Sequence, residues 1–285
     1  MRGKFSGKLS PSAVGDAGAV NIILNLAAHA DRRMAAIATT NGAALFYGFG
    51  NFCALAAMPD LESMKRVNRL KGRPLDQAGS VTTDPRRASL VFDWDRLPEG
   101  LTRETVEAVM ADFLALGPIG FRGPAASRVP EHLTVVDRGV RTAQLISPGV
   151  HCRSNELIGE ILDRAGEGLL FITSANRSGN VSKNVEAAHC EMAAIRDEFG
   201  HRPEAVLIGH RDEYAARRMY PRHLPCSTSI VAFHRGALVL ERHGSLGIED
   251  ARAIAARHGL DLTVAPGART RVPVRWPADD VLRAA

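Results

Sequence analysis

The stretch Thr173-Ser174-Ala175-Asn176-Arg177-Ser178-Gly179 directly follows the apolar run Leu169-Leu170-Phe171-Ile172. A short apolar run that ends in turn residues predicts a buried strand leading into a tight polar loop. Serine and asparagine side chains both donate and accept hydrogen bonds, and glycine lets backbone N–H groups approach a ligand closely. The loop is therefore suited to an anionic or polar ligand. Taken alone, the same residues are better explained as a turn and a helix cap, because they are common in turns.

A second polar stretch, Lys71-Gly72-Arg73-Pro74, lies far upstream, where glycine and proline end a predicted helix. Residues i and i+2 of an extended segment point to the same side, so Lys71 and Arg73 are aimed together. Two such cations can hold a triphosphate, with arginine as a planar fork and lysine as a point charge. By itself the stretch is also explained as a solvated helix end whose cations complement the helix dipole.

Composition sets broad limits on the function. The chain has 285 residues, of which 45% are hydrophobic, enough for one large domain or two ordinary ones. Its net charge of +5 weakly favours anionic partners such as nucleotides, nucleic acid or pyrophosphate. The four cysteines form no Cys-x-x-Cys pair and the histidines are scattered, so no metal ligand is predicted.

Two further kinds of motif are missing from the sequence. There is no glycine-rich Rossmann or P-loop fingerprint, so a bound nucleotide must be held in another way. The chain has neither a cleavable apolar N-terminal segment nor a run of about 18 apolar residues. We therefore expect a soluble, cytoplasmic protein that does not associate with a membrane.

The pattern of apolar residues predicts an α/β protein, a twisted mixed sheet with helices outside, because several predicted strands come in adjacent pairs. Residues 1–17 are rich in glycine, serine and lysine, and we expect them to be loose. The predicted helices cover 19–28, 61–71, 102–116, 154–166, 185–199 (capped by Asn184) and 248–258. The predicted strands cover 34–39, 43–47, 119–121, 133–136, 143–146, 169–173, 205–208, 229–233 and 237–240.

Taken together and in order, these stretches resemble the YrdC-like family, the L-threonylcarbamoyladenylate synthases. Lys-Gly-Arg-Pro followed far downstream by Thr-Ser-Ala-Asn-Arg-Ser-Gly is the main resemblance. Other landmarks fall in the family order: Leu45–Gly50, Gly117–Ile119, Cys226–Val231 and Leu240–Gly244. The resemblance covers residues 18–247, which predicts a YrdC-like domain there and leaves 248–285 as a C-terminal helix and tail.

The resemblance implies a twisted mixed sheet flanked by helices, with a large, positively charged cavity. It implies an ATP-dependent enzyme that joins L-threonine and bicarbonate into threonylcarbamoyl-AMP and releases pyrophosphate. The product serves the N6-threonylcarbamoyl modification of adenosine in tRNA. Mg²⁺ would arrive on the triphosphate, and no tightly bound metal or organic cofactor is expected. The implied catalytic and ATP-binding residues are Lys71, Arg73, Ser174 and Asn176; Thr228, Ser229 and Arg242 would also bind ATP, and Thr40 and Tyr47 the other substrates.

The sequence departs from the family pattern at four places. Asn41 stands where an acidic residue is usual, and Ile146 stands where the family has a cavity arginine. Ala78 replaces the proline that follows the Lys-x-Arg-Pro motif, and Ala232 replaces the aspartate of a late strand. These changes fall on the amino-acid side of the cavity more than on the phosphate side. They leave open whether threonine is the amine.

Two alternatives remain at this stage. In the first, the chain binds nucleotide or RNA, including double-stranded RNA, without making an adenylate. The basic runs 65–73 and 217–223 would contact phosphates, with Tyr220 as the main aromatic residue near them. In the second, the adenylation chemistry is kept, but a different amine or a different carbamoyl donor such as carbamoyl phosphate is used.

Overall fold

The strand that carries the Thr-Ser-Ala-Asn loop lies in the middle of the sheet. In the computed structural model, which describes residues 22–177 and 187–277, β8 (Leu170–Ser174) lies between β3 (Cys53–Ala57) and β4 (Ser80–Thr82). β8 is antiparallel to both neighbours. The apolar run before the loop is therefore a buried strand, as predicted, and its end reaches the centre of the molecule.

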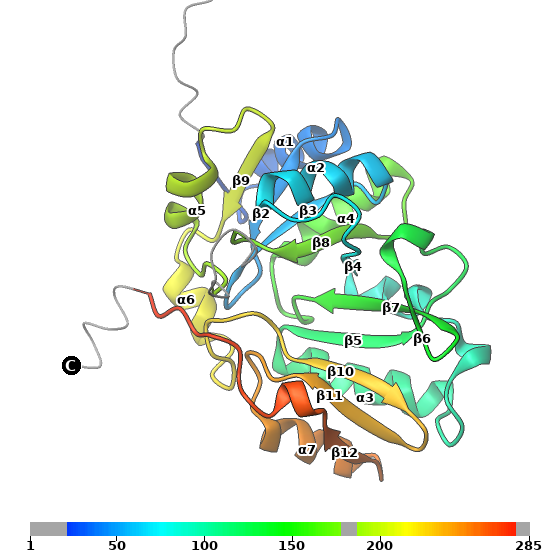
Figure 1. The fold of residues 1–285 in the computed structure, drawn as a ribbon. Helices are drawn as coiled ribbons and strands as arrows, with labels where there is room; N and C mark the ends of the chain where they lie inside the picture. Colours follow the sequence, from blue (N-terminus) through cyan, green and yellow to red (C-terminus); the bar gives the residue numbers. More distant parts are fainter. Residues whose placement is uncertain (1–21, 178–186, 278–285) are drawn as a thin grey trace, which may run out of the picture.

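The strands of the described part form one twisted, mixed sheet of 12 strands (Figure 1). Its order is β1-β9-β2-β3-β8-β4-β7-β5-β10-β11-β12, and β6 pairs with β7 alone. Parallel and antiparallel pairs both occur, so the predicted fold class is confirmed. The remaining strands are β1 (Ile23–Asn25), β2 (Ala44–Gly48), β5 (Ile119–Pro124), β6 (Val135–Asp137), β7 (Val140–Ser147), β9 (Ala205–Gly209), β10 (Ile230–His234), β11 (Ala237–Arg242) and β12 (Asp261–Val264).

Helices cover the sheet, with α1 and α2 at one end of Figure 1 and α3 and α7 at the other. Alternate residues of the central strands enter two separate apolar clusters, which is expected of strands buried on both faces. On β8, for example, Phe171 packs in one cluster and Ile172 in the other. The helices are α1 (His29–Thr40), α2 (Leu61–Lys71), α3 (Arg103–Leu116), α4 (Ser154–Ala165), α5 (Met192–Phe199), α6 (Glu213–Arg218) and α7 (Ile248–Arg257).

Two N-terminal predictions are wrong. The described part of the predicted helix 19–28 is β1 and a turn, and the predicted strand 34–39 lies inside α1. The strand forms because β1 pairs in parallel with β9 along the sheet edge, a long-range contact that the local pattern does not show. The run 34–39 is rich in alanine, the best helix former, and α1 packs against α4 through ion pairs of Arg32 with Glu156 and Glu160.

The helix predicted from Val185 begins only at Met192 within the described residues. Residues 187–191 form a loop, because the backbone of His189 bonds to β3 through Cys53 and to the loop after β8 through Ala175. These hydrogen bonds compete with a helical backbone. The cap Asn184 lies outside the described residues, as do residues 1–17.

The sheet continues beyond residue 247. β12 pairs in parallel with β11, and α7 packs against α3. The chain then returns along the molecule (Figure 1). On this path Val272 N–H donates to the carbonyl of His243, and the Cys190 thiol donates to the carbonyl of Arg275. The C-terminal segment therefore connects the two ends of the sheet.

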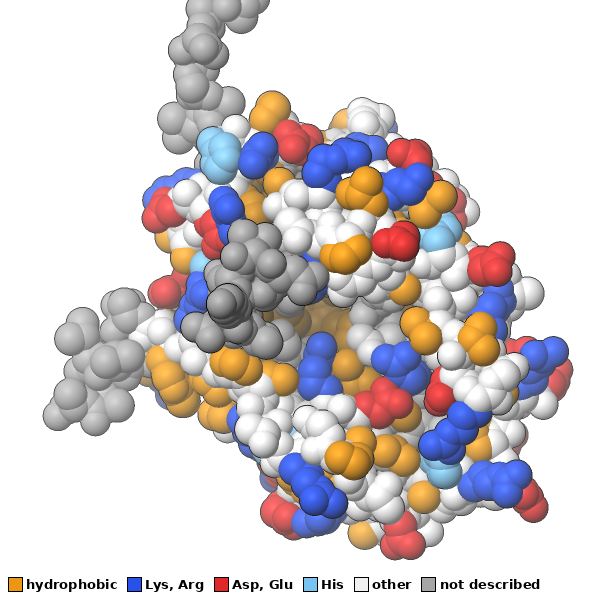
Figure 2. All heavy atoms as spheres, in the orientation of Figure 1, with side chains coloured by type: hydrophobic (Ala, Val, Ile, Leu, Met, Phe, Trp, Pro, Cys, Tyr) orange, Lys and Arg blue, Asp and Glu red, His pale blue; other side chains and the backbone are white. Residues whose placement is uncertain are grey.

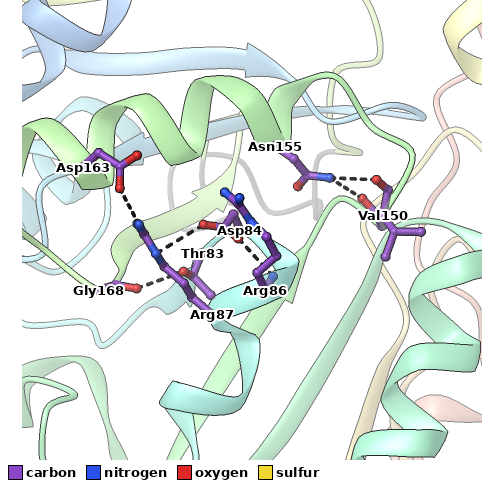
Figure 3. A network of polar contacts seen from close by, with 9 residues as sticks. Thr83, Asp84, Arg86, Arg87, Val150, Asn155, Asp163 and Gly168 are labelled. Carbon is purple, nitrogen blue, oxygen red and sulfur yellow. Dashed lines mark hydrogen bonds and ion pairs between the residues drawn. The ribbon is translucent and has the colours of Figure 1, made fainter.

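A buried carboxylate holds the turn that follows β4 (Figure 3). Asp84 is 1% exposed and caps the short 3₁₀ helix Pro85–Val91 by accepting from the backbone N–H of Arg86. Its carboxylate also pairs with the guanidinium of Arg87, which reaches Asp163 on α4. This network fixes the chain segment between β4 and α3.

Candidate functional site

A cavity of about 240 Å³ opens where β8 ends. Figure 2 shows a hollow near the middle of this face, with lysine and arginine side chains at its lower edge. Three arginines and several hydroxyl and amide side chains border the cavity, and no carboxylate is among the described residues that line it. The polar lining includes Arg73, Ser80, Arg122, Gln144, Ser174 and Arg242.

The structure brings the two polar stretches of the sequence together. Gly72 ends α2 in the left-handed conformation, with φ 68°, which glycine adopts without strain. The chain then turns, so that the Arg73 guanidinium donates to Thr173 Oγ1 at 2.8 Å. The Lys71 ammonium donates to the backbone carbonyl of Ser174. The segment after α2 is thus fastened to the end of β8.

The polar loop after β8 has its own hydrogen bonds. The Ser174 hydroxyl donates to Asn176 Oδ1 at 2.5 Å, and the Asn176 amide donates to the carbonyl of Arg177 at 2.8 Å. Ser174 borders the cavity, whereas Asn176 is 7% exposed and is not one of the residues that line it. Asn176 therefore orients the serine hydroxyl. Ser178 and Gly179 lie outside the described residues.

Arg242 borders the cavity opposite this loop, at the end of β11. Its guanidinium donates to the carbonyl of Thr228 at 2.7 Å and to Thr228 Oγ1 at 2.9 Å. Burial lowers the pKa of Arg242 to about 10 and also lowers the pKa of Arg73, because a buried environment disfavours the charged form. A pKa of about 10 still leaves Arg242 charged at neutral pH.

Four other predicted site residues do not line the cavity. Lys71 is 0% exposed and lies behind the loop that it fastens. The Ser229 hydroxyl accepts from the backbone N–H groups of Gly244 and Leu246, so it joins β10 to the chain after β11. The Thr40 hydroxyl donates within its own helix. Tyr47 is 0% exposed, and burial raises the pKa of its hydroxyl. Direct ligand binding by these four residues stays a prediction.

Sequence analysis missed Arg122, Gln144 and Ser80. Their side chains form a chain of contacts along the cavity, in which Arg122 donates to Gln144 and Gln144 donates to Ser80. One signal was present: Arg122 follows Ile119 and Phe121 in a strand and alternates with them, so it occupies the other face. Ile146, the position of the expected family arginine, also borders the cavity.

The basic runs that favoured RNA are largely engaged in local contacts. Lys65 pairs with Glu62, Arg66 donates to the carbonyl of Gly42, and Arg222 pairs with Asp250. Tyr220, the aromatic residue near these runs, is 3% exposed and its ring is buried. It therefore cannot stack on a base without rearrangement.

Two kinds of feature are absent from the part of the chain that the structure describes. No helix there is long and apolar enough to cross a membrane. No group of three or more histidine, cysteine or acidic side chains there could hold a metal ion.

No protein-family model and no curated protein sequence matches the chain. Solved structures do resemble it. A double variant of P. abyssi Sua5 is 17% identical with a TM-score of 0.62, covering 88% of this chain and 67% of its own. P. abyssi Sua5 complexed with L-threonine is 17% identical with a TM-score of 0.60, covering 92% and 74%. E. coli YciO is 18% identical with a TM-score of 0.51, covering 73% and 86%. The chain therefore has the fold of the Sua5 and YciO structures, as its resemblance to the YrdC-like family predicts.

Proposed function

We propose that the chain is a divergent YrdC-like enzyme that forms a carbamoyl-adenylate from ATP, bicarbonate and an amino acid. L-threonine is the amino acid that we expect first, and the product would then be threonylcarbamoyl-AMP for the modification of adenosine in tRNA. One observation carries the proposal: Arg73, Ser174 and Arg242 come from distant parts of the sequence and border one cavity.

The proposed reaction needs positioning and charge stabilisation more than a nucleophilic side chain. The amine first combines with bicarbonate to give a carbamate and water. A carbamate oxygen then attacks the α-phosphorus of ATP, the bond to the β-phosphate oxygen breaks, and pyrophosphate leaves with the negative charge. Arg73 and Arg242, both charged and partly shielded from water, would stabilise that charge.

The remaining members of the tetrad have supporting roles in this proposal. On ligand binding, the Ser174 hydroxyl would turn from Asn176 Oδ1 and donate instead to a phosphate or carbamate oxygen. Lys71 holds the backbone of Ser174 in place from behind, and its positive charge adds to the field at the loop. Asn176 fixes the direction of the Ser174 hydroxyl.

The donor set of the cavity fits magnesium that arrives with the nucleotide. Mg²⁺ prefers oxygen ligands, mostly phosphates, waters and carboxylates. The described lining offers arginines, hydroxyls and amides but no carboxylate. Phosphate oxygens and water would therefore supply the ligands of Mg²⁺, and the arginines would bind the oxygens that the metal leaves free.

The first test is pyrophosphate release by the purified full chain with ATP, Mg²⁺, bicarbonate and each amino acid in turn. We expect release that depends on bicarbonate and is fastest with L-threonine. Release with another amine alone would keep the chemistry and change the substrate, as the departures at Asn41 and Ile146 allow. No release with any amine, under conditions in which ATP binds, would contradict the proposal.

A pair of arginine variants tests the site itself. Arg73→Ala removes a guanidinium beside the phosphates, and charge-assisted hydrogen bonds of about 1.5–3 kcal/mol predict a 10- to 100-fold weaker affinity for ATP. Arg69→Ala removes an exposed arginine of α2 that does not line the cavity, and should leave ATP affinity unchanged. Equal ATP affinity in both variants would show that the nucleotide is not held at this cavity.

A further inference from the structure

The wall of the cavity formed by β5 and β7 carries a guanidinium held in a fixed position. Arg122 Nε donates to the Glu241 carboxylate at 2.6 Å, and Arg122 Nη2 donates to Gln144 Oε1 at 2.7 Å. Gln144 in turn donates to Ser80 Oγ at 2.6 Å. Strands β4, β7, β5 and β11 thus contribute to one network, which fixes the plane of the guanidinium before any ligand arrives.

The sheet register explains why Arg122 faces the cavity. On β5, Ile119 and Phe121 pack into the apolar cluster around α3, so Arg122 points to the opposite face. On β7, the strand partner of Arg122 is Gln144, and both side chains border the cavity. The charged side chain is therefore placed by strand alternation and pairing.

Arg122 has binding capacity left after these contacts. A guanidinium has five N–H donors, and the described contacts use two of them. Its side chain is 24% exposed, and Glu241 balances its charge. The remaining donors can form a planar, two-pronged contact, which matches the geometry of a carboxylate.

The surroundings of Arg122 suit a small amino acid. Ile146 lies two residues from Gln144 on β7, on the same face, and Val135 of β6 also borders the cavity. Gly120 leaves room for Ile146, because a Cβ there would lie 2.7 Å from Ile146 Cδ1. A guanidinium beside an aliphatic surface can hold a carboxylate and a short aliphatic side chain together.

We infer that Arg122 binds the α-carboxylate of the amino-acid substrate, with Gln144 and Glu241 as positioning residues; this inference rests on the proposed function. The guanidinium thereby replaces the arginine that is absent at position 146. It comes from the neighbouring strand, two residue pairs along the β5–β7 ladder, since Gly120 pairs with Ile146 and Arg122 with Gln144. The nucleotide would lie toward Arg73 and Arg242, so the carbamate would form between the two groups.

The test is calorimetric titration of the full-length protein with two ligands, L-threonine and L-threoninol, in which CH₂OH replaces the carboxylate. Arg122→Ile should weaken L-threonine binding by about 10- to 100-fold, the range of a lost charge-assisted contact. Its affinity for L-threoninol should not change, because that ligand lacks the anionic group. Arg235→Ile, on the adjoining groove but not on this cavity, is the control and should bind both ligands as the wild type does.

Moving the arginine from position 122 to position 146 tests whether Arg122→Ile loses affinity through the missing contact or through a disturbed fold. The double variant Arg122→Ile/Ile146→Arg should regain part of the L-threonine affinity that Arg122→Ile loses. Arg122→Lys keeps the charge but loses the two-pronged geometry, so its affinity for L-threonine should lie between those of the wild type and Arg122→Ile. It also replaces Arg122→Ile in the test if that variant does not fold. In the pyrophosphate assay, both Arg122→Ile and Arg122→Lys should have a higher KM for threonine than the wild type and the same KM for ATP.

Each outcome supports or overturns the inference. Wild-type threonine affinity in both Arg122→Ile and Arg122→Lys overturns it, as does equal weakening of threonine and threoninol, or no threonine binding by the wild type. Arg122-dependent threonine binding without pyrophosphate release supports it and overturns the proposed function. Pyrophosphate release that does not depend on Arg122 supports the proposed function and overturns the inference about Arg122.

Discussion

His223 should make the stability of the protein depend on pH. The side chain is 8% exposed, its Nδ1 lies 3.0 Å from Ser245 Oγ, and its ring meets that of Tyr220 edge to face. Burial lowers its pKa from 6.5 to about 4, although the nearby Asp250 carboxylate and a hydrogen bond to the backbone of Leu116 oppose the shift. The folded protein therefore keeps this histidine neutral under mildly acidic conditions.

The sign and size of the effect follow from proton linkage. Between about pH 6.5 and pH 4 the unfolded chain binds a proton at this histidine that the folded protein does not bind, so the free energy of unfolding falls as the pH falls. With these two pKa values, His223 alone lowers that free energy by about 2 kcal/mol between pH 7.5 and pH 5. His210, whose pKa burial also lowers to about 4, adds a loss in the same direction.

The assay is urea denaturation of the wild type and His223→Gln at pH 7.5 and pH 5.0, followed by circular dichroism. Glutamine does not titrate, so the variant should lose about 2 kcal/mol less than the wild type over this interval. His201→Gln changes an exposed histidine and should lose as much as the wild type does. The reasoning fails if His223→Gln and the wild type lose the same stability.

Two further predictions concern residues on either side of β4. Gly79→Ala places a Cβ 2.0 Å from the ring of the fully buried Phe171, so we expect the free energy of unfolding, measured by urea denaturation, to fall by about 1–3 kcal/mol. Gly168→Ala, with open space around it, should unfold with nearly the wild-type free energy. Similar losses in the two variants would contradict the packing argument. Asp84→Asn removes the charge that holds two arginines (Figure 3), and we expect a loss of about 1.5–3 kcal/mol, measured in the same way. Asp163→Asn, at the exposed end of the same network, should cause a loss below about 1 kcal/mol, and an equal loss in both would show that burial of Asp84 is unimportant.

Local signals in the sequence predicted several elements correctly. Asp60 and Thr102 cap α2 and α3 by accepting from backbone N–H groups three residues on, and the left-handed glycines Gly72 and Gly166 end α2 and α4. The buried strand before Thr173 was also visible, because an apolar run bounded by turn residues is a local pattern. The resemblance of the ordered motifs then gave the fold class.

The failures at β1, at β12 and at the helix predicted from Val185 share a physical cause. β1 and β12 are short strands at the two edges of the sheet, and each forms because a distant strand offers it a partner. The helix predicted from Val185 is shortened because the backbone of His189 forms its hydrogen bonds with β3 and with the loop after β8. Pairings of this kind depend on residues far away in the sequence, so no local window contains them.

The sequence by itself determined that Lys71 and Arg73 belong with the Ser174 loop. It did so because those segments carry residue types that bind anions and stand in a recognisable order. Only the tertiary structure decided which of the side chains reach the cavity: Arg73 and Ser174 do, whereas Lys71 is buried behind them. It also placed Arg122 on the cavity wall, because strand register, which long-range pairing sets, determines the face on which each side chain lies.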